Sequence, residues 1–192
     1  MQRTKPLKIY LGDLTYTTVT LATEAFPLNV GFIASYCKKL FGDNVEITLF
    51  KYIEDIDKAV NENPPDVLGL SNYCWSHNVS YEIFKMCKKA NPNSITVWGG
   101  PNFPIDFPSQ KKFMKKYPEV DVYVPTEGET GFSNVVSLVL KLDTLKDASQ
   151  TIQKNPIEGC ISRDIDGEIH YSIPTIRISS LNEIPSPYQN GM

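Results

Sequence analysis

The sequence predicts an α/β fold: a flavodoxin-like (Rossmann-like) three-layer domain with a five-stranded parallel sheet in the order 2-1-3-4-5, plus a C-terminal β-hairpin. The chain contains five short, nearly continuous apolar runs, which is the pattern of strands buried on both faces. Segments with helical periodicity separate most of these runs, and such alternation favours parallel strands joined by right-handed crossovers. A chain of 192 residues is also long enough for one self-sufficient core with a short appendage.

Strands and helices are expected to alternate along the first 142 residues. The strands are expected at 7–11, 45–50, 67–70, 95–98 and 121–124. The helices are expected at 29–40, 53–61, 79–90, 109–116 and 130–142. Prolines support two of the helix ends, because Pro64 and Pro92 cannot continue a helix. In a sheet of this order, ligands bind at the carboxyl ends of the strands.

The pattern changes after residue 142, and the chain is expected to divide into three parts. Residues 1–142 form the α/β domain, 143–178 a linker and β-hairpin, and 179–192 a connector. The polar stretch 143–155 fits either a linker or a frayed helix. Asp166-Gly167 lies between two alternating runs, 157–163 and 168–173, which is a strong signal for a hairpin.

Composition excludes several classes of protein. A net charge of −3 and a pI near 5.4 argue against nucleic-acid binding. The longest apolar stretch, 135–142, is far shorter than the ~20 residues of a membrane span, and the N-terminus lacks the apolar core of a signal peptide. The four cysteines have no metal-ligand spacing, and the chain has only two histidines. We therefore expect a cytoplasmic protein that binds neither nucleic acid nor membrane and has no metal site of its own.

The first two loops after strands offer candidate ligand-binding residues. The loop 12–27 is much longer than the ~2–6 residues usual between a strand and a helix, so it predicts a binding loop, although it could also only pack. In the loop after strand three, the small Ser71 leaves space for a ligand. Tyr73 and Trp75 offer flat apolar faces with a polar atom. His77 fits better as a first-turn helix residue than as a ligand.

The loops after strands four and five supply the remaining candidates. Gly99 and Gly100 permit a close approach to the backbone, or serve only a tight turn. Glu127 and Glu129 could bind a ligand, or could equally stabilise the start of the next helix. No G-x-G-x-x-G or Walker motif occurs, which argues against the usual nucleotide folds.

Taken in order, these segments resemble a known family. They comprise a proline-led first helix (27–31), the strand 66–71 followed by Tyr73 and Trp75, the run 98–101, and the segment 120–129. This ordered set resembles the N-terminal cobalamin-binding domain of cobalamin-dependent radical SAM enzymes. The closing stretch 181–188 is similar to the segment that precedes the radical SAM barrel in those enzymes.

The resemblance implies that the chain binds cobalamin at the carboxyl edge of the sheet. Ser71 and Tyr73 match the family's serine motif, Gly99 and Gly100 match its double glycine, and these would line the cleft for the nucleotide tail of the corrin. Other cobalamin domains carry D-x-H-x-x-G where this chain reads Asp-Leu-Thr-Tyr-Thr-Thr at 13–18, so the cobalt-ligating histidine is absent. The candidate cofactor-binding residues are Asp13, Leu14, Thr15, Tyr16, Ser71, Asn72, Tyr73, Trp75, Gly99, Gly100, Pro101, Glu127 and Gly128.

The family's C-x-x-x-C-x-x-C motif is missing from this chain. The resemblance therefore implies a fragment that is not catalytic alone. Its partner would be the C-terminal radical SAM domain of the same parent chain, with the iron–sulfur cluster and S-adenosylmethionine, in a methyltransferase-like enzyme. Two alternatives remain open: a degenerate domain without a cofactor that caps the barrel, and a flavodoxin-like flavin binder, whose phosphate loop the run 15–20 faintly resembles. A bulky residue at Gly100 is expected to abolish cobalamin binding and leave the fold intact.

Overall fold

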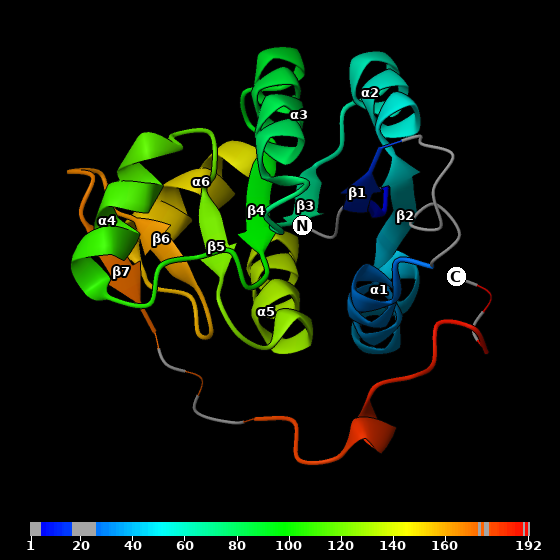
Figure 1. The fold of residues 1–192 in the computed structure, drawn as a ribbon. Helices are drawn as coiled ribbons and strands as arrows, with labels where there is room; N and C mark the ends of the chain where they lie inside the picture. The colour runs from blue at the N-terminus through cyan, green and yellow to red at the C-terminus, as the bar shows by residue number, and fades with distance from the viewer. Residues whose placement is uncertain (1–4, 17–25, 173, 175–176, 190, 192) are drawn as a thin grey trace.

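A computed structural model of the protein describes residues 5–16, 26–172, 174, 177–189 and 191 (Figure 1). It contains one seven-stranded sheet in the order β2-β1-β3-β4-β5-β6-β7. The first five strands are parallel and confirm the predicted order 2-1-3-4-5. They are β1 (Leu7–Thr15), β2 (Val45–Tyr52), β3 (Val67–Ser71), β4 (Ile95–Gly99) and β5 (Val122–Val124).

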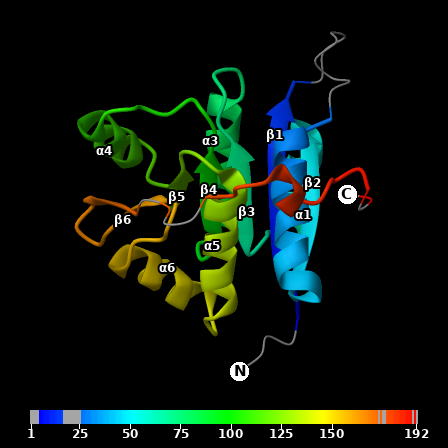
Figure 2. The same ribbon diagram turned by 90° about the horizontal axis from the view of Figure 1, so that it is seen from below.

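Helices cover both faces of the sheet and give the expected three layers (Figures 1 and 2). The helices are α1 (Leu28–Phe41), α2 (Ile53–Glu62), α3 (His77–Ala90), α4 (Phe107–Lys116), α5 (Gly128–Leu140) and α6 (Leu145–Lys154). Helices α1 and α5 share one apolar core, whereas α2 and α3 share the other. Alternate strand residues separate the two cores, because Ile9 and Leu11 belong to the first and Tyr10 to the second.

The hairpin is part of the sheet. Its strands, β6 (Ile161–Arg163) and β7 (Ile169–Tyr171), pair antiparallel, and β6 also pairs antiparallel with β5. The polar stretch before it is a helix rather than a linker, since Thr144 caps α6 and Ala148 and Ile152 are buried. The boundary at residue 142 stays a prediction.

The first strand ends later than predicted. Strand β1 extends to Thr15 because its pairing with β2 resumes at Thr15 and Tyr52 after an irregularity that follows Gly12. Most of the long loop predicted after this strand, residues 17–25, lies outside the described part of the chain. None of the helices in the described ranges has the length and apolar character that crossing a membrane requires.

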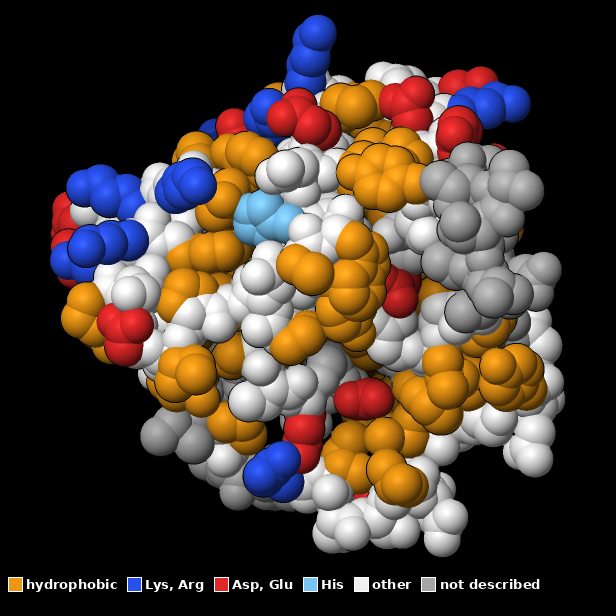
Figure 3. All heavy atoms as spheres, in the orientation of Figure 1, with side chains coloured by type: hydrophobic (Ala, Val, Ile, Leu, Met, Phe, Trp, Pro, Cys, Tyr) orange, Lys and Arg blue, Asp and Glu red, His pale blue; other side chains and the backbone are white. Residues whose placement is uncertain are grey.

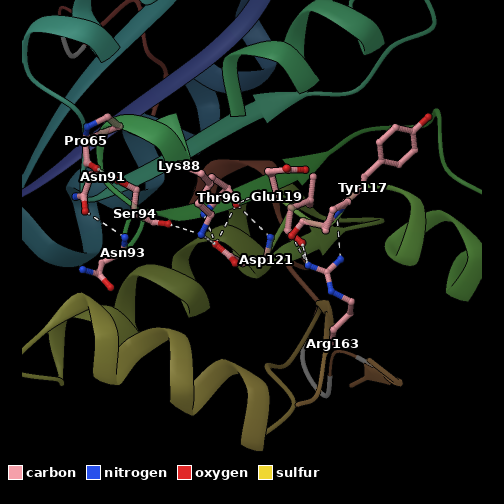
Figure 4. Close-up of polar contacts among 12 residues, drawn as sticks. Pro65, Lys88, Asn91, Asn93, Ser94, Thr96, Tyr117, Glu119, Asp121 and Arg163 are labelled. Atoms are coloured by element: carbon pink, nitrogen blue, oxygen red, sulfur yellow. Dashed lines mark hydrogen bonds and ion pairs between the residues drawn. The ribbon is translucent and has the colours of Figure 1, made fainter. Parts of the chain in front are cut away.

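Arg163 of β6 fastens the hairpin to the segment that links α4 to β5 (Figure 4). Its guanidinium donates hydrogen bonds to the carbonyl oxygens of Met114, Tyr117, Pro118 and Val120. Burial lowers the pKa of Arg163, while the nearby acids Asp121 and Glu119 act in the opposite direction. Beside it, Asp121 accepts from Lys88 Nζ at 2.6 Å and from the Thr96 amide at 2.8 Å.

Replacing Arg163 with Met is expected to lower the free energy of unfolding by about 2 kcal/mol, because several partly buried carbonyls lose their donor. Urea denaturation followed by circular dichroism measures the change. The matched control is Arg177→Met, which removes a mostly exposed guanidinium and is expected to change stability by less than about 0.5 kcal/mol. Equal midpoints for the two variants would show that Arg163 has no structural role.

Candidate cofactor site

A slot of about 370 Å³ opens between α1 and α5, over the carboxyl ends of the central strands. The helices begin at this edge because each follows a parallel strand, so their first turns form the walls of the slot. In Figure 3, apolar side chains gather around the positions of α5 and α1 with acidic side chains among them, and a group of basic side chains lies over α4. The lining residues are Leu11, Asn29, Val30, Ile33, Gly69, Leu70, Ser71, Tyr73, Val97, Gly99, Gly100, Pro101, Val124, Pro125, Thr126, Gly128, Glu129 and Phe132.

The strand register divides the floor of the slot into two levels. At the lower level, Gly69 of β3 pairs with Leu11 on one side and Val97 on the other. At the upper level, nearer the strand ends, Gly99 of β4 lies between Ser71 and Val124. The two levels are two residues apart along each strand, which is about 6.6 Å at 3.3 Å per residue.

The slot is apolar at the bottom. A Cβ at Gly69 would lie 2.7 Å from both Leu11 Cδ2 and Phe132 Cε2, so these side chains already fill the space over this glycine. Val30 and Ile33 of α1 complete the apolar walls. Leu11, Val97 and Phe132 are each no more than 3% exposed.

The mouth of the slot is polar. Asn29 Nδ2 donates to Ser71 Oγ at 2.9 Å and to the Tyr73 hydroxyl at 3.4 Å. Asn29 Oδ1 accepts from the Val30 amide at 2.8 Å, which fixes the orientation of the side chain. Burial raises the pKa of Asp13, while hydrogen bonding to the Asn29 and Ser71 side chains opposes that rise. The structure therefore brings three of the candidate residues, Asp13, Ser71 and Tyr73, together around Asn29.

The two adjacent glycines have different roles. A Cβ at Gly99 would meet nothing closer than Val124 O, at 3.4 Å, which is ordinary contact. Gly100 has φ +120°, and a Cβ there would lie 2.9 Å from Asn72 O and 3.2 Å from Asn72 N. The expectation that a bulky residue at Gly100 leaves the fold intact is therefore wrong, because the backbone itself requires this glycine.

Asn72 is held within the protein rather than presented to the slot. It is fully buried, and its Nδ2 donates to the Asn102 carbonyl at 2.7 Å and to the Tyr123 hydroxyl at 3.1 Å. Its Oδ1 lies 2.8 Å from His77 Nδ1. The His77 ring stacks on Trp98 with centroids 4.7 Å apart, and burial lowers its pKa. Both residues thus belong to the polar and aromatic cluster on the opposite face of the sheet.

Leu14 is also placed away from the slot. It is 1% exposed in the core shared with α2 and α3, because alternation along β1 turns Leu14 and Tyr10 to the same face. Thr15 lies in the strand and pairs with Tyr52, and the Tyr16 side chain is half exposed just beyond it. The Leu14 side chain therefore cannot contact a ligand in the slot.

The remaining predicted residues lie around the rim. The Tyr73 and Trp75 rings stack at 4.6 Å with an interplanar angle of 4°, and Trp75 is largely exposed. Pro101 and Gly128 line the slot. Glu127 does not line it: its carboxylate accepts from Arg177 Nε at 2.8 Å, and this pairing lowers the pKa of Glu127.

Residues 177–188 form a strap, which passes over the start of α5 and then crosses α1 (Figures 1 and 2). Beyond the Glu127–Arg177 pair, Lys39 Nζ donates to the Glu183 carbonyl at 2.6 Å. Pro187 is buried against Gly31, where a Cβ would lie 3.2 Å from the Pro187 Cβ. The strap therefore contacts both helices that form the walls of the slot.

Sequence reasoning missed the helical walls of the slot. Asn29, Val30, Ile33 and Phe132 line it, together with Gly69 and Val97 on the strands. Their helical or alternating spacing is the same signal that marks core residues, so only the position of Asn29 and Val30 at the start of a helix could have suggested a site.

Fold and site together define an α/β cofactor-binding domain. The slot lies at the carboxyl ends of parallel strands, is apolar at depth and carries polar groups at its mouth, as small-molecule sites of this class do. Among the described residues, no cluster of His, Cys, Asp and Glu could hold a metal ion.

The family described as the B12 binding domain matches residues 15–136. The chain therefore belongs to the B12-binding domain family, and cobalamin is its cofactor. This confirms the resemblance seen in the sequence and favours neither the flavin nor the cofactor-free alternative.

Three curated relatives are methyltransferases by name. The chain is 28% identical over 175 residues to the 2-(S-pantetheinyl)-carbapenam-3-carboxylate methyltransferase of Streptantibioticus cattleyicolor, covering 89% of this chain and 24% of that protein. It is 40% identical over 117 residues to the cobalamin-dependent radical SAM methyltransferase TokK of Streptomyces tokunonensis, covering 58% and 16%. It is 26% identical over 172 residues to the uncharacterized methyltransferase PH0819 of Pyrococcus horikoshii, covering 87% and 34%. The chain thus spans about a third or less of each relative.

Solved structures share the fold. The cobalamin-dependent S-adenosylmethionine radical enzyme OxsB, with aqua-cobalamin and S-adenosylmethionine bound, superposes with a TM-score of 0.64 at 20% identity, covering 95% of this chain and 24% of that one. Its apo form gives a TM-score of 0.63 at 20% identity, covering 97% and 25%.

Proposed function

We propose that this chain holds cobalamin with its nucleotide tail in the slot between α1 and α5 and its corrin over the strand ends. The observation that carries the proposal is the slot itself, which is apolar at the bottom and polar at the mouth, in a member of the B12-binding domain family. Cobalamin, when bound, supplies cobalt-centred methyl or radical chemistry, and the domain supplies binding and orientation.

The residues present fit a flat aromatic group attached to a polar chain. Gly99 leaves open the upper level of the floor, where a larger side chain would occupy the slot. Asn29, Ser71 and Tyr73 offer hydrogen-bonding groups at the mouth. Their network is already connected in the structure, which orients Asn29 before any ligand arrives.

No histidine of this chain is placed to bind cobalt. The chain has two histidines; His77 hydrogen-bonds within the opposite face of the sheet, and His170 lies in β7 beside Asp164. Thr15 takes the position of the histidine found in other cobalamin domains. We infer that this domain holds the corrin without a protein histidine ligand.

The partner that we propose is a C-terminal radical SAM domain of the same parent chain. The chain matches only a fraction of its methyltransferase relatives, and it carries no C-x-x-x-C-x-x-C motif. Radical chemistry would then belong to the partner, with its iron–sulfur cluster and S-adenosylmethionine. All four cysteines are free, which fits a reducing compartment such as the cytoplasm.

A titration tests the proposal. The purified chain is mixed with hydroxocobalamin, desalted, and examined by absorbance, with flavin mononucleotide in a parallel sample. We expect a retained corrin spectrum and no retained flavin. A folded chain that emerges without corrin, or that retains flavin instead, contradicts the proposal.

A further inference from the structure

We propose that His77 is a positioning residue of the cofactor site, held as the Nδ1–H tautomer so that it donates to Asn72 and thereby fixes the Gly99-Gly100 turn. Its effect on binding rests on the proposed function. The inference goes beyond that function because it assigns a role and a proton to a side chain outside the slot. His77 is the first residue of α3, on the opposite face of the sheet, and acts on the slot through Asn72.

The orientation of the Asn72 amide is fixed by its partners. Its Nδ2 lies 2.7 Å from the Asn102 carbonyl oxygen, which can only accept a hydrogen bond, so the atom at this position must be the nitrogen. The same nitrogen donates to the Tyr123 hydroxyl at 3.1 Å, and the side chain is fully buried, so bulk water cannot replace these partners. Asn72 Oδ1 therefore points the other way, and it lies 2.8 Å from His77 Nδ1.

This orientation decides the tautomer of His77. An amide oxygen is an acceptor, so the ring nitrogen 2.8 Å from it carries the proton. Asn102 Nδ2 lies 3.3 Å from the same ring nitrogen, and the other tautomer would accept from it, but only by setting two acceptors 2.8 Å apart. With Nδ1 protonated, Asn102 Nδ2 donates instead to Asn72 Oδ1 at 3.2 Å, and each hydrogen bond has one donor and one acceptor.

The second ring nitrogen is satisfied as well. His77 Nε2 lies 2.8 Å from the Tyr117 hydroxyl, which can donate to it. Burial and the nearby Lys116 lower the pKa of His77, so the ring is neutral at neutral pH and Nε2 accepts. The stack on Trp98 holds the plane of the ring. The Nδ1 proton is therefore directed to Asn72.

Asn72 carries this constraint to the slot. Its backbone amide donates to the Gly99 carbonyl at 2.6 Å, and its carbonyl accepts from the Asn102 amide at 3.2 Å. The Tyr123 hydroxyl, which accepts from Asn72, donates to the Gly100 carbonyl at 2.8 Å. Both glycines line the slot, so Asn72 sets how the loops after β3 and β4 meet at its mouth.

Two substitutions of His77 separate this role from packing, because both remove the ring and its stack on Trp98. Asparagine places an amide N–H near the position of Nδ1, whereas glutamine is one methylene longer and places it near Nε2. We expect Kd for cobalamin, measured by absorbance titration, to rise at least tenfold in His77→Gln, because Asn72 Oδ1 loses a buried donor. His77→Asn supplies that donor, and its Kd should be at least fivefold lower than that of His77→Gln.

A spectroscopic measurement tests the tautomer without cobalamin. Long-range proton–nitrogen NMR spectra of isotope-labelled imidazole rings distinguish the Nδ1–H form from the Nε2–H form. His170→Gln leaves His77 as the only histidine of an untagged chain, which assigns the signals. We expect the Nδ1–H form at neutral pH. The Nε2–H form or an imidazolium would overturn the inference.

The outcomes keep this inference apart from the proposed function. A folded wild-type chain that retains no corrin would overturn the proposed function and the positioning role with it, whichever tautomer is found. Wild-type binding together with equal Kd values for folded His77→Asn and His77→Gln would overturn the positioning role alone. Thermal unfolding shows whether both variants are folded, and the tautomer of the wild-type chain decides the matter if either is not.

Discussion

Replacing Gly99 with Leu is expected to raise Kd for cobalamin more than 100-fold while the protein stays folded. A Cβ at this position makes only ordinary contact, 3.4 Å from Val124 O, and its φ is not in the left-handed region. The rest of the leucine side chain would extend into the upper level of the slot, between Ser71 and Val124. The ligand and the side chain would then compete for one space.

Cobalamin titration and thermal unfolding, measured on the same preparation, check this prediction. Gly99→Ala is the graded control: it adds only the Cβ, so we expect a Kd between those of the wild type and Gly99→Leu. A Gly99→Leu protein that unfolds near the wild-type temperature and still binds with the wild-type Kd would show that cobalamin does not occupy this slot.

Much of the fold follows from the apolar pattern of the sequence. Strands such as β3 and β4 are buried on both faces, so their residues read as continuous apolar runs and their order follows from the crossover rule. The end of β1 was missed because Asp13 and Thr15 are polar, although the chain there still pairs with β2. The sequence did not decide between a linker and a helix at α6, because only Ala148 and Ile152 of its ten residues are buried and the apolar pattern is therefore weak.

The candidate site residues could be predicted from the sequence where they lie at the ends of strands or in the loops that follow them. Ser71 and Gly99 were identified by their places at strand ends, and both line the slot. Leu14 and Asn72 were included among the candidates because they are sequence neighbours of Asp13 and Ser71. The alternation of side chains along β1 already places Leu14 on the face opposite Leu11. The partners of Asn72, His77 and Tyr123, come from distant parts of the chain, so no local pattern could reveal that its amide is buried.

Replacing Gly100 with Ala is expected to lower the free energy of unfolding by about 3 kcal/mol, since an L residue at an unfavourable φ costs about 1–3 kcal/mol before any collision is counted. The φ of +120° is one cause. The second is the Cβ, which would lie 2.9 Å from the Asn72 carbonyl oxygen, a backbone atom that cannot move aside alone. That oxygen also accepts from the Asn102 amide, so a shift there would disturb the loop after β4. Urea denaturation measures the loss.

Gly167→Ala is the control without a collision. Gly167 also has a positive φ, +80°, but a Cβ there would meet nothing within 4 Å. It should therefore carry only the conformational cost, about 1 kcal/mol for a residue in the left-handed region. The difference between the two variants measures the collision with Asn72 together with any extra conformational cost of φ +120° over φ +80°. If Gly100→Ala were no less stable than Gly167→Ala, the backbone at Asn72 would have to yield freely, and Gly100 would then matter for the ligand rather than for the fold. Because Gly99 and Gly100 are neighbours that differ in this respect, the pair distinguishes a glycine that leaves room for the cofactor from one that the backbone itself requires.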